Sequence, residues 1–310
     1  MGCANIAIRS VIPTIKESDH YELVAVASRS AEKASQVAET FSCDAITGYE
    51  NLLKIKEIDA IYMPLPTGLH EEWVMRTIDS GKHILCEKSL AMNYESATRM
   101  VDHARNHNVL LMENFMFLYH SQHQYVKAIL DSGDLGSIRC FRSSFGFPPL
   151  GKSNFRYNQA AGGGSLLDAA AYTIRASQLI LGNDLTVEAA TLNYEDEEVD
   201  IFGGAFLKSK NGSFAEVAFG FDNYYQCNYE IWGSKGKLTL HKAFTPKPTE
   251  KPRITIDKQN NRKEFELAAD DHFRNILIHF KEELEKNNYD SKYNEILIQS
   301  RLLSELKNKS

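Results

Sequence analysis

The sequence has little of what marks membrane, secreted or nucleic-acid-binding proteins. Its 310 residues contain no uninterrupted run of 18 apolar residues, so no membrane span is predicted. Arg9, Pro13 and Lys16 break the apolar N-terminal stretch, which argues against a secretory signal peptide. No basic run is present, and a net charge of −6 with a pI near 6.0 argues against a nucleic-acid surface.

Cysteine is also scarce. The five cysteines are odd in number and show no CxxC spacing; they lie at Cys3, Cys43, Cys86, Cys140 and Cys227. We therefore expect neither a disulfide framework nor a zinc or other metal site, and a reducing cytoplasm fits best. The remaining composition, 43% hydrophobic and 25% charged, is ordinary for a soluble globular protein of one large or two ordinary domains.

The first third of the chain alternates apolar runs with amphipathic segments. Four strands are predicted, each followed by a helix or a turn: YELVAVAS (21–28), AIYMPLP (60–66), HILCEK (83–88) and VLLMENF (109–115). Strands alternating with helices of ten or more residues predict an α/β doubly wound parallel sheet, and their near-continuous apolar character fits strands covered on both faces.

The pattern changes after about residue 120. A helix over 122–131 leads to a strand near 138–147, and a long helix between Gly162 and Gly182 precedes several strands up to about residue 256. Hairpins are predicted at Asn211-Gly212 and at Ser234–Gly236, and two helices near 270–287 and 291–308 end the chain. We expect a dinucleotide-binding domain at 1–117 and an α+β domain with a mostly antiparallel sheet at 118–310, with the terminal helices able to pack back on the first domain.

The segment GCANIA, residues 2–7, resembles the G-x-G-x-x-G/A turn that holds a dinucleotide's pyrophosphate at a helix N-terminus. Its three positions are Gly2, Ala4 and Ala7, so a single glycine remains, and taken alone a coincidental match is the better reading. Pro13 in the following helix predicts a kink or a late exception to the helix.

The strand at 21–28 ends in Ser28-Arg29-Ser30, without an acidic residue. An acidic residue there would bind the ribose 2′-hydroxyl of NAD, whereas an arginine accommodates a 2′-phosphate, so NADP is favoured over NAD. The alternative is an ordinary polar strand end with Ser30 as the N-cap of the next helix, and both interpretations stay open.

Two further strands end in polar loops, PLPTGLH and CEKSL. Ligands of open α/β sheets bind at the carboxyl ends of the strands, and a lysine such as Lys88 can polarise a carbonyl there. The alternative is a surface Glu87-Lys88 pair. In GGGSLLDAAAY, Asp168 and Tyr172 are four residues apart on one helical face, and a tyrosine with a nearby cation can serve as a general acid. A core tyrosine bonded to Asp168 remains the alternative.

These motifs together resemble one family. GCANIA, SRSAEKA, PLPTGLH, CEKSLA, MENFMF and GGGSLLDAAAY follow the order and spacing of the glucose-fructose oxidoreductase/inositol dehydrogenase/MocA family over nearly the whole chain. The resemblance implies an N-terminal Rossmann domain for NAD(P) and a C-terminal domain whose open sheet face often builds dimers or tetramers. The segment beginning NFRYNQ at residue 154 is most similar to NADPH-dependent reductases of 3-keto nucleotide sugars in deoxysugar biosynthesis.

The resemblance also implies site residues. Lys88 matches the lysine of the family's E-K-P motif, with Ser89 in place of the proline, which we expect to loosen the loop. Tyr172 would give a proton to the alkoxide. Lys88, 172 − 88 = 84 residues earlier in the other domain, would polarise the carbonyl or tune the phenol. Substrate contacts are expected from Asp168, Asn114 and Arg156, with Arg156 near a diphosphate. For Asn114 and Arg156 a structural role remains an equal alternative. His70 is expected near the nicotinamide ribose.

We expect NADP(H) rather than NAD(H) to be bound, a sugar or nucleotide sugar to be the substrate, and a homodimer or homotetramer to form. The expected cofactor-binding residues are Gly2, Ala4, Asn5, Ile6, Ser28, Arg29, Lys33, Leu65, His70, Glu87 and Lys88.

Two other functions remain open. One is an NADP-dependent dehydrogenase of a free aldose or a dihydrodiol. The other is a cofactor-binding regulator without turnover, which the presence of Lys88, Asp168 and Tyr172 argues against.

The turn at Gly2 lacks the strand that should lead into it, because only Met1 precedes it. In the strand order 3-2-1-4-5-6 that strand is central, so its loss would leave two unpaired edges inside the sheet. We therefore expect an apolar strand of about five to seven residues to belong before Met1.

Overall fold

The computed structural model describes residues 1–310, and the chain divides into two compact units. Unit 1 contains residues 1–114 and 273–297, and unit 2 contains residues 115–272 and 298–310. The last helix, α9 (Asp290–Asn308), contributes residues to both units.

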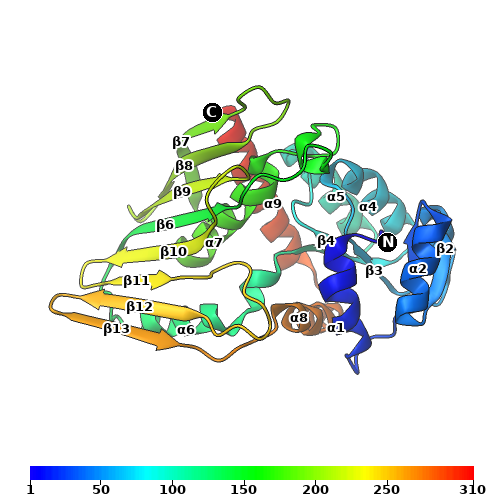
Figure 1. Ribbon diagram of the computed structural model, residues 1–310, viewed down its shortest axis with the longest axis horizontal. Helices are drawn as coiled ribbons and strands as arrows, with labels where there is room; N and C mark the ends of the chain where they lie inside the picture. The colour runs from blue at the N-terminus through cyan, green and yellow to red at the C-terminus, as the bar shows by residue number, and fades with distance from the viewer. The chain divides into compact units, whose positions relative to one another are not determined.

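Unit 1 is built on parallel strands that lie in two separate sheets (Figure 1). The strands are β1 (Ala25–Ser28), β2 (Asp44–Thr47), β3 (Ala60–Met63), β4 (His83–Glu87) and β5 (Leu111–Asn114). One sheet has the order β1-β2 and the other has the order β3-β4-β5, and all pairs are parallel. The predicted break in the Rossmann sheet is therefore present, between β1 and β3.

Helices precede, connect or follow the parallel strands of unit 1. They are η1 (Ala7–Val11), α1 (Ile12–Lys16), α2 (Ala31–Phe41), α3 (Tyr49–Leu53), η2 (Thr67–Leu69), α4 (His70–Asp79), α5 (Tyr94–Asn106) and α8 (His272–Lys286). Pro13 lies at the start of α1, directly after the π-helix η1, where its missing N–H is tolerated.

Unit 2 contains one eight-stranded sheet in the order β13-β12-β11-β10-β6-β9-β8-β7. Only β6 and β9 are parallel, so the sheet is mostly antiparallel, as predicted. Its strands are β6 (Ile138–Gly146), β7 (Leu185–Asn193), β8 (Phe202–Ser209), β9 (Phe214–Gly220), β10 (Gln226–Gly233), β11 (Lys237–Leu240), β12 (Arg253–Lys258) and β13 (Asn261–Glu266).

Four helical segments accompany this sheet: η3 (Met116–Tyr119), α6 (Ser121–Asp131), η4 (Phe155–Tyr157) and the continuous pair η5 (Leu166–Ala170) and α7 (Ala171–Leu181). Helix α7 packs on β6 and β9 (Figure 1). It ends at Gly182, whose φ is +89°, so the predicted stop is confirmed.

Some elements differ from the sequence prediction. Strand β1 begins at Ala25 rather than at residue 21, and β3 ends at Met63, before Pro64. The short β2 and the outer strand β13 were not predicted, because their residues are mostly exposed and polar and carry no apolar run.

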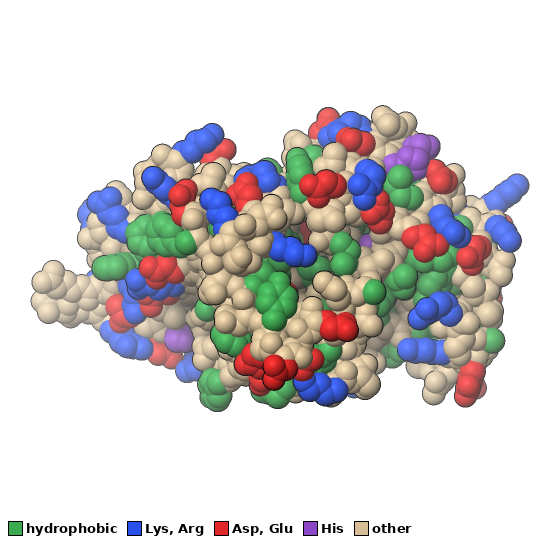
Figure 2. Space-filling model, turned by 90° about the horizontal axis from the view of Figure 1, so that it is seen from above, with side chains coloured by type: hydrophobic (Ala, Val, Ile, Leu, Met, Phe, Trp, Pro, Cys, Tyr) green, Lys and Arg blue, Asp and Glu red, His purple; other side chains and the backbone are tan.

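Charged side chains of both signs are mixed on one face of the molecule. On the face shown in Figure 2, Lys and Arg side chains lie among Asp and Glu side chains, and neither sign forms a continuous field. None of the helices combines the length and the hydropathy needed to cross a membrane. All five cysteines are free thiols, four of them buried.

A buried histidine makes the stability of unit 2 depend on pH. His123 lies in α6 with Nδ1 3.0 Å from the Tyr229 hydroxyl and Nε2 3.1 Å from the Ala243 carbonyl, which suits a neutral ring that donates from Nε2. Burial lowers its pKa to about 3. In the unfolded chain the His123 side chain takes up a proton below about pH 6.5, whereas in the folded chain it stays neutral. The contribution of His123 to the free energy of unfolding is therefore fully present above that pH and decreases as the pH falls.

We expect the free energy of unfolding, from urea titrations, to fall by about 2 kcal/mol more between pH 7.5 and pH 5 in the wild type than in His123→Gln. The exposed His20→Gln variant should keep the wild-type dependence. Equal pH dependence in wild type and His123→Gln would contradict this account.

Candidate functional site

The glycine turn of unit 1 is confirmed as a tight turn that opens a helix. Gly2 has a φ of +95°, and a Cβ there would lie 2.8 Å from Cδ2 of Leu65, so only glycine fits. The carbonyl of Ala4 accepts from the amide of Ile8 at 3.1 Å, and the helix runs from Asn5 to Lys16. Gly2, Ala4, Asn5 and Ile6 thus stand where a helix N-terminus can receive a phosphate.

The end of β1 lies beside this turn. Ser30 caps α2 by accepting from the amide of Lys33 at 3.2 Å, so the capping role is confirmed. Burial raises the pKa of the Cys3 thiol in the turn. The nearby positive charge of Lys33 acts in the opposite direction and lowers it. Arg29 is exposed, and its guanidinium lies against the Tyr49 phenol. Two cations therefore flank the turn, as a cofactor with a 2′-phosphate requires.

His70 joins the loops that follow β3 and β4. It is fully buried, with Nε2 2.7 Å from the Leu65 carbonyl and Nδ1 3.0 Å and 3.1 Å from the carbonyls of Leu90 and Ser89. Burial lowers the pKa of His70, although the hydrogen bonds to these carbonyls act to raise it. Both ring nitrogens are occupied by the protein, so the structure gives His70 the task of holding the Lys88 loop in place.

Ser89 does not leave that loop loosely held. It is buried, and its carbonyl accepts from the Thr67 hydroxyl at 3.0 Å as well as facing His70. The Lys88–Ser89 peptide is cis. The expectation that replacing proline loosens this loop was wrong, because contacts from the β3 loop hold it. The loop presents Lys88, which is half-buried, directly after β4.

Glu87 and Asn114 lie next to each other at the carboxyl ends of β4 and β5. Oε1 of Glu87 accepts from the Tyr62 hydroxyl at 2.6 Å and from Nδ2 of Asn114 at 2.5 Å. Burial raises the pKa of Glu87 although these bonds oppose the rise. Oδ1 of Asn114 is buried and has no partner in the protein. A buried acceptor without a donor is costly, so this atom is a natural contact for a bound molecule.

In unit 2, the structure brings Asp168 and Arg156 together. Nε of Arg156 lies 2.5 Å from Oδ2 of Asp168, and Nη2 lies 3.4 Å from Oδ1. Burial acts to lower the pKa of Arg156, but the neighbouring Asp168 carboxylate outweighs it, and the pKa is raised. Arg156 therefore holds Asp168 in place, a specific pairing that the sequence did not predict.

Tyr172 lies one helical turn beyond Asp168, where η5 continues into α7. Its side chain is only 6% exposed, and its hydroxyl lies 3.8 Å from Sδ of Met116. Four aromatic rings surround it at centroid distances of 4.8 to 6.0 Å: Phe145, Phe244, Phe117 and Phe115. Arg156 is near enough to interact with it electrostatically. The phenol is thus fixed in orientation by apolar packing, beside a cation.

The glycines before this helix allow close backbone packing. A Cβ on Gly163 would lie 2.3 Å from the Arg156 carbonyl oxygen, and one on Gly164 would lie 2.3 Å from Oδ1 of Asp200. Asp200 accepts from the Ser165 hydroxyl and from the amide of Leu166, both at 2.6 Å, so it caps the helix from 35 residues away. Sequence reasoning missed Asp200, because nothing in its acidic surroundings shows that it is buried.

One possible metal-ligand set lies elsewhere in unit 1. Ligand atoms of Asp79, His103 and His107 lie within 4.8 Å of one another on α4 and α5 and the residue after α5. His103 and His107 follow the His-x₃-His spacing, a sequence signal that was not taken into account when no metal site was predicted.

The comparisons with known proteins cover both units. Residues 1–115 match the model of the oxidoreductase family GFO/IDH/MocA with an NAD-binding Rossmann fold, and residues 123–239 match that of the GFO/IDH/MocA C-terminal domain. A dTDP-3,4-didehydro-2,6-dideoxy-alpha-D-glucose 3-reductase from Actinomadura kijaniata is 41% identical over 281 residues, 90% of this chain and 85% of the relative. D-xylose 1-dehydrogenase (NADP(+)) 2 from Haloferax volcanii is 34% identical over 257 residues, which are 82% of this chain and 78% of the relative.

A solved structure matches over almost the whole chain. The crystal structure of a 3-ketoreductase from Actinomadura kijaniata, in complex with NADP and TDP-benzene, has a TM-score of 0.96 and 38% identity, covering 99% of this chain and 95% of that one. That enzyme has also been solved as a Tyr→Phe and as a Lys→Ala variant, and the two substituted positions are 84 residues apart. Tyr172 and Lys88 have the same separation, 172 − 88 = 84.

A Cβ added at Gly163 would meet the backbone of Arg156. We therefore expect Gly163→Ala to displace Arg156 from Asp168 and to lower the free energy of unfolding by about 1–3 kcal/mol. Thermal unfolding of the variant checks this. Gly151→Ala is the matched control, since a Cβ there meets nothing within 4 Å, and it should change stability by less than about 0.5 kcal/mol. An unchanged melting temperature for Gly163→Ala would show that the loop can move aside.

Proposed function

Because the chain belongs to the GFO/IDH/MocA oxidoreductase family, we propose that it reduces the keto group of a nucleotide-linked sugar with NADPH. The observation that carries this proposal is the pair Lys88 and Tyr172, which has the 84-residue separation of the lysine and tyrosine substituted in the related 3-ketoreductase. A 3-ketoreductase relative that is 41% identical supports the choice of a keto nucleotide sugar.

The residues of unit 1 fit NADP(H). The glycine turn at Gly2 opens a helix whose N-terminus can receive a pyrophosphate, and exposed Arg29 and Lys33 offer charge to a 2′-phosphate. The unpartnered Oδ1 of Asn114 offers an acceptor at the carboxyl ends of the strands. When bound there, NADPH supplies the hydride that reduces the carbonyl carbon.

The side chains supply the rest of the reaction. Tyr172 would give its hydroxyl proton to the carbonyl oxygen while the hydride adds to the carbonyl carbon, so the ketone would become an alcohol, and solvent would then reprotonate the phenol. Lys88 polarises the carbonyl and stabilises the negative charge that develops on its oxygen. The nearby guanidinium of Arg156 favours the phenolate left behind.

Asp168 orients the sugar in this scheme. Its carboxylate is kept ionised and in one rotamer by the two hydrogen bonds from Arg156, so it can accept a hydrogen bond from a sugar hydroxyl. His70 acts on Lys88 indirectly, by holding the loop, rather than on the cofactor.

The thiols and the exposed apolar side chains also bear on the cellular compartment and the oligomeric state. We assign it to the cytoplasm, since five free cysteines suit a reducing compartment. A homodimer or homotetramer is proposed, because Trp232 and Phe206 on the large sheet are 50% and 36% exposed.

One second function deserves a test. The 34% identity to a D-xylose 1-dehydrogenase favours oxidation of a free aldose as the alternative to reduction of a nucleotide sugar. A regulator without turnover is disfavoured, since it needs neither Lys88 nor Tyr172.

Turnover with a substrate panel separates these functions. We expect the absorbance of NADPH to fall when 3-keto nucleotide sugars are added, and that of NADH to fall more slowly with the same substrates. Free aldoses and dihydrodiols should give no reduction of NADP. Activity confined to free aldoses or dihydrodiols would establish the alternative instead.

Replacing the proton donor tests the mechanism. We expect Tyr172→Phe to lower kcat for ketosugar reduction by about 10²-fold or more while leaving the dissociation constant of NADPH unchanged, because the phenol acts only on the substrate oxygen. Tyr125→Phe, at a tyrosine that is 39% exposed, is the matched control and should keep wild-type kcat. Full activity in Tyr172→Phe would remove Tyr172 from the proton-transfer step.

A further inference from the structure

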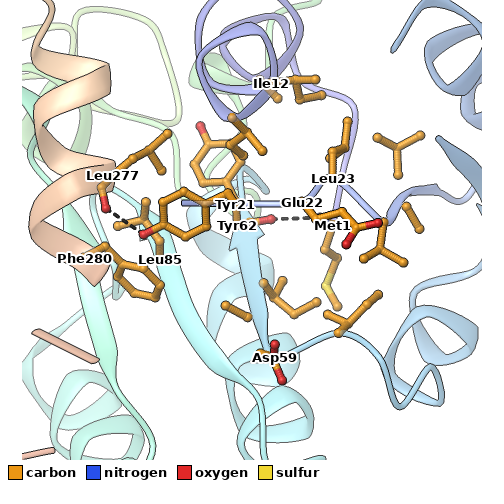
Figure 3. A pocket seen from close by; sticks show the side chains of 18 of the residues that line it. Met1, Ile12, Tyr21, Glu22, Leu23, Asp59, Tyr62, Leu85, Leu277 and Phe280 are labelled. Atoms are coloured by element: carbon orange, nitrogen blue, oxygen red, sulfur yellow. Dashed lines mark hydrogen bonds between the residues drawn. The ribbon is translucent and has the colours of Figure 1, made fainter. Parts of the chain in front are cut away.

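A cavity of about 340 Å³ in unit 1 lies outside the proposed reaction and offers no ligand set for an ion. Its walls are mainly apolar, with side chains such as Ile12, Leu85 and Phe280 (Figure 3). The carboxylates of Glu22 and Asp59 lie apart from each other in this cavity (Figure 3), and they belong to no group of three converging His, Cys, Asp or Glu side chains.

Such a group does exist between two helices of the same unit. Asp79 is the last residue of α4, His103 lies in the last turn of α5, and His107 is the residue that follows α5. Their ligand atoms all lie within 4.8 Å of one another. Helices α4 and α5 pack against each other (Figure 1), and nearer their starts Glu71 of α4 bonds to Arg99 of α5 at 2.6 Å. The packing of the two helices therefore holds the three side chains together.

Hydrogen bonds orient both imidazole rings. Nδ1 of His107 lies 2.9 Å from the His103 carbonyl oxygen, which can only accept, so Nδ1 donates and the neutral ring carries its lone pair on Nε2. A bond of this kind to a backbone carbonyl commonly orients histidines that bind metals. Nε2 of His103 lies 2.7 Å from Oδ1 of Asp79, and the centroids of the two rings are 4.3 Å apart. Two ring nitrogens and a carboxylate thus converge.

The electrostatic setting favours a cation. Helices α4 and α5 both end at the cluster, and a helix C-terminus carries partial negative charge. Two arginines of these helices have acidic partners other than Asp79: Arg76 lies 2.9 Å from Glu72, and Arg105 lies 3.2 Å from Asp102. Neither guanidinium therefore neutralises the carboxylate of Asp79.

We propose that Asp79, His103 and His107 bind one Zn²⁺ ion, with water as the fourth ligand. Imidazole nitrogens with one carboxylate suit zinc, whereas Mg²⁺ and Ca²⁺ prefer ligand sets made of oxygen. Ligand atoms on a tetrahedral zinc ion lie about 3.4 Å apart for bonds of about 2.1 Å, which small rotations of these side chains reach. The ion takes the place of the proton between His103 and Asp79, and the neutral His103 ring then carries its proton on Nδ1.

The ion would link α4 to α5 and take no part in hydride transfer. Because each helix runs back along the parallel sheet, α4 and α5 end near the starts of β4 and β5. Lys88 and Asn114 stand at the opposite, carboxyl ends of these strands. Helix α4 alone separates Asp79 from His70 by about 14 Å along its axis. The zinc site is thus distinct from the proposed active site, and the inference does not depend on the proposed function.

Isothermal titration calorimetry of the full chain, treated with EDTA and desalted, tests the site. We expect one Zn²⁺ to bind per wild-type chain, and His107→Gln to weaken binding by about 100-fold or more, since losing even an outer partner of a metal ligand costs about 10- to 100-fold. Asp102→Asn and His20→Gln are matched controls, because Asp102 bonds to Arg105 and His20 is an exposed histidine elsewhere. Both controls should keep the wild-type affinity.

Thermal unfolding gives a second readout. Zinc at 100 times its dissociation constant should raise the melting temperature of the wild type by about 4 °C, and that of His107→Gln by less than about 1 °C at the same concentration. Equal zinc affinity or an equal rise in the two proteins would place the ion elsewhere and overturn the proposal. Wild-type affinity for Mg²⁺ equal to that for Zn²⁺ would also overturn it. Neither readout uses NADPH or substrate, so the result is independent of whether the chain reduces ketosugars.

Discussion

The two hydrogen bonds made by Met1 and Gly2 are the constraint on which unit 1 depends. They connect β1 through Ala27 and β3 through Tyr62, strands that otherwise lie in different sheets. The same two residues place the glycine turn and the helix that begins at Asn5. The geometry of the turn, which we propose holds the cofactor's phosphates, therefore rests on this short stretch of main chain.

The polar residues of the site are held by contacts of their own. His70 and Thr67 hold the Ser89 carbonyl and with it the Lys88 loop, while Arg156 holds Asp168 and a ring of aromatic side chains holds Tyr172. Such support restricts the rotamers of the groups that must act on a substrate, which is how proteins prepare a site before binding. The chemistry assigned to Lys88 and Tyr172 depends on these neighbours as much as on the two residues themselves.

Much of this could be read from the sequence, and the failures have physical causes. Apolar runs and glycine stops located most strands and α7, because burial and helix termination act locally. The pairing of Arg156 with Asp168 and the cap from Asp200 escaped notice, since they join residues whose proximity only the folded chain creates. The role of Ser89 was misjudged for the same reason: its loop is held by Thr67 and His70, which lie in another loop.

The central claim is that a hydride passes from NADPH to a ketosugar. The direct measurement is to supply NADPH deuterated at C4, separately on each face, with a 3-keto nucleotide sugar, and to analyse the product by mass spectrometry and NMR. The account predicts one deuterium at the former keto carbon from one of the two labelled cofactors. A reduced sugar without deuterium from either cofactor, or no reduced sugar at all, would contradict it.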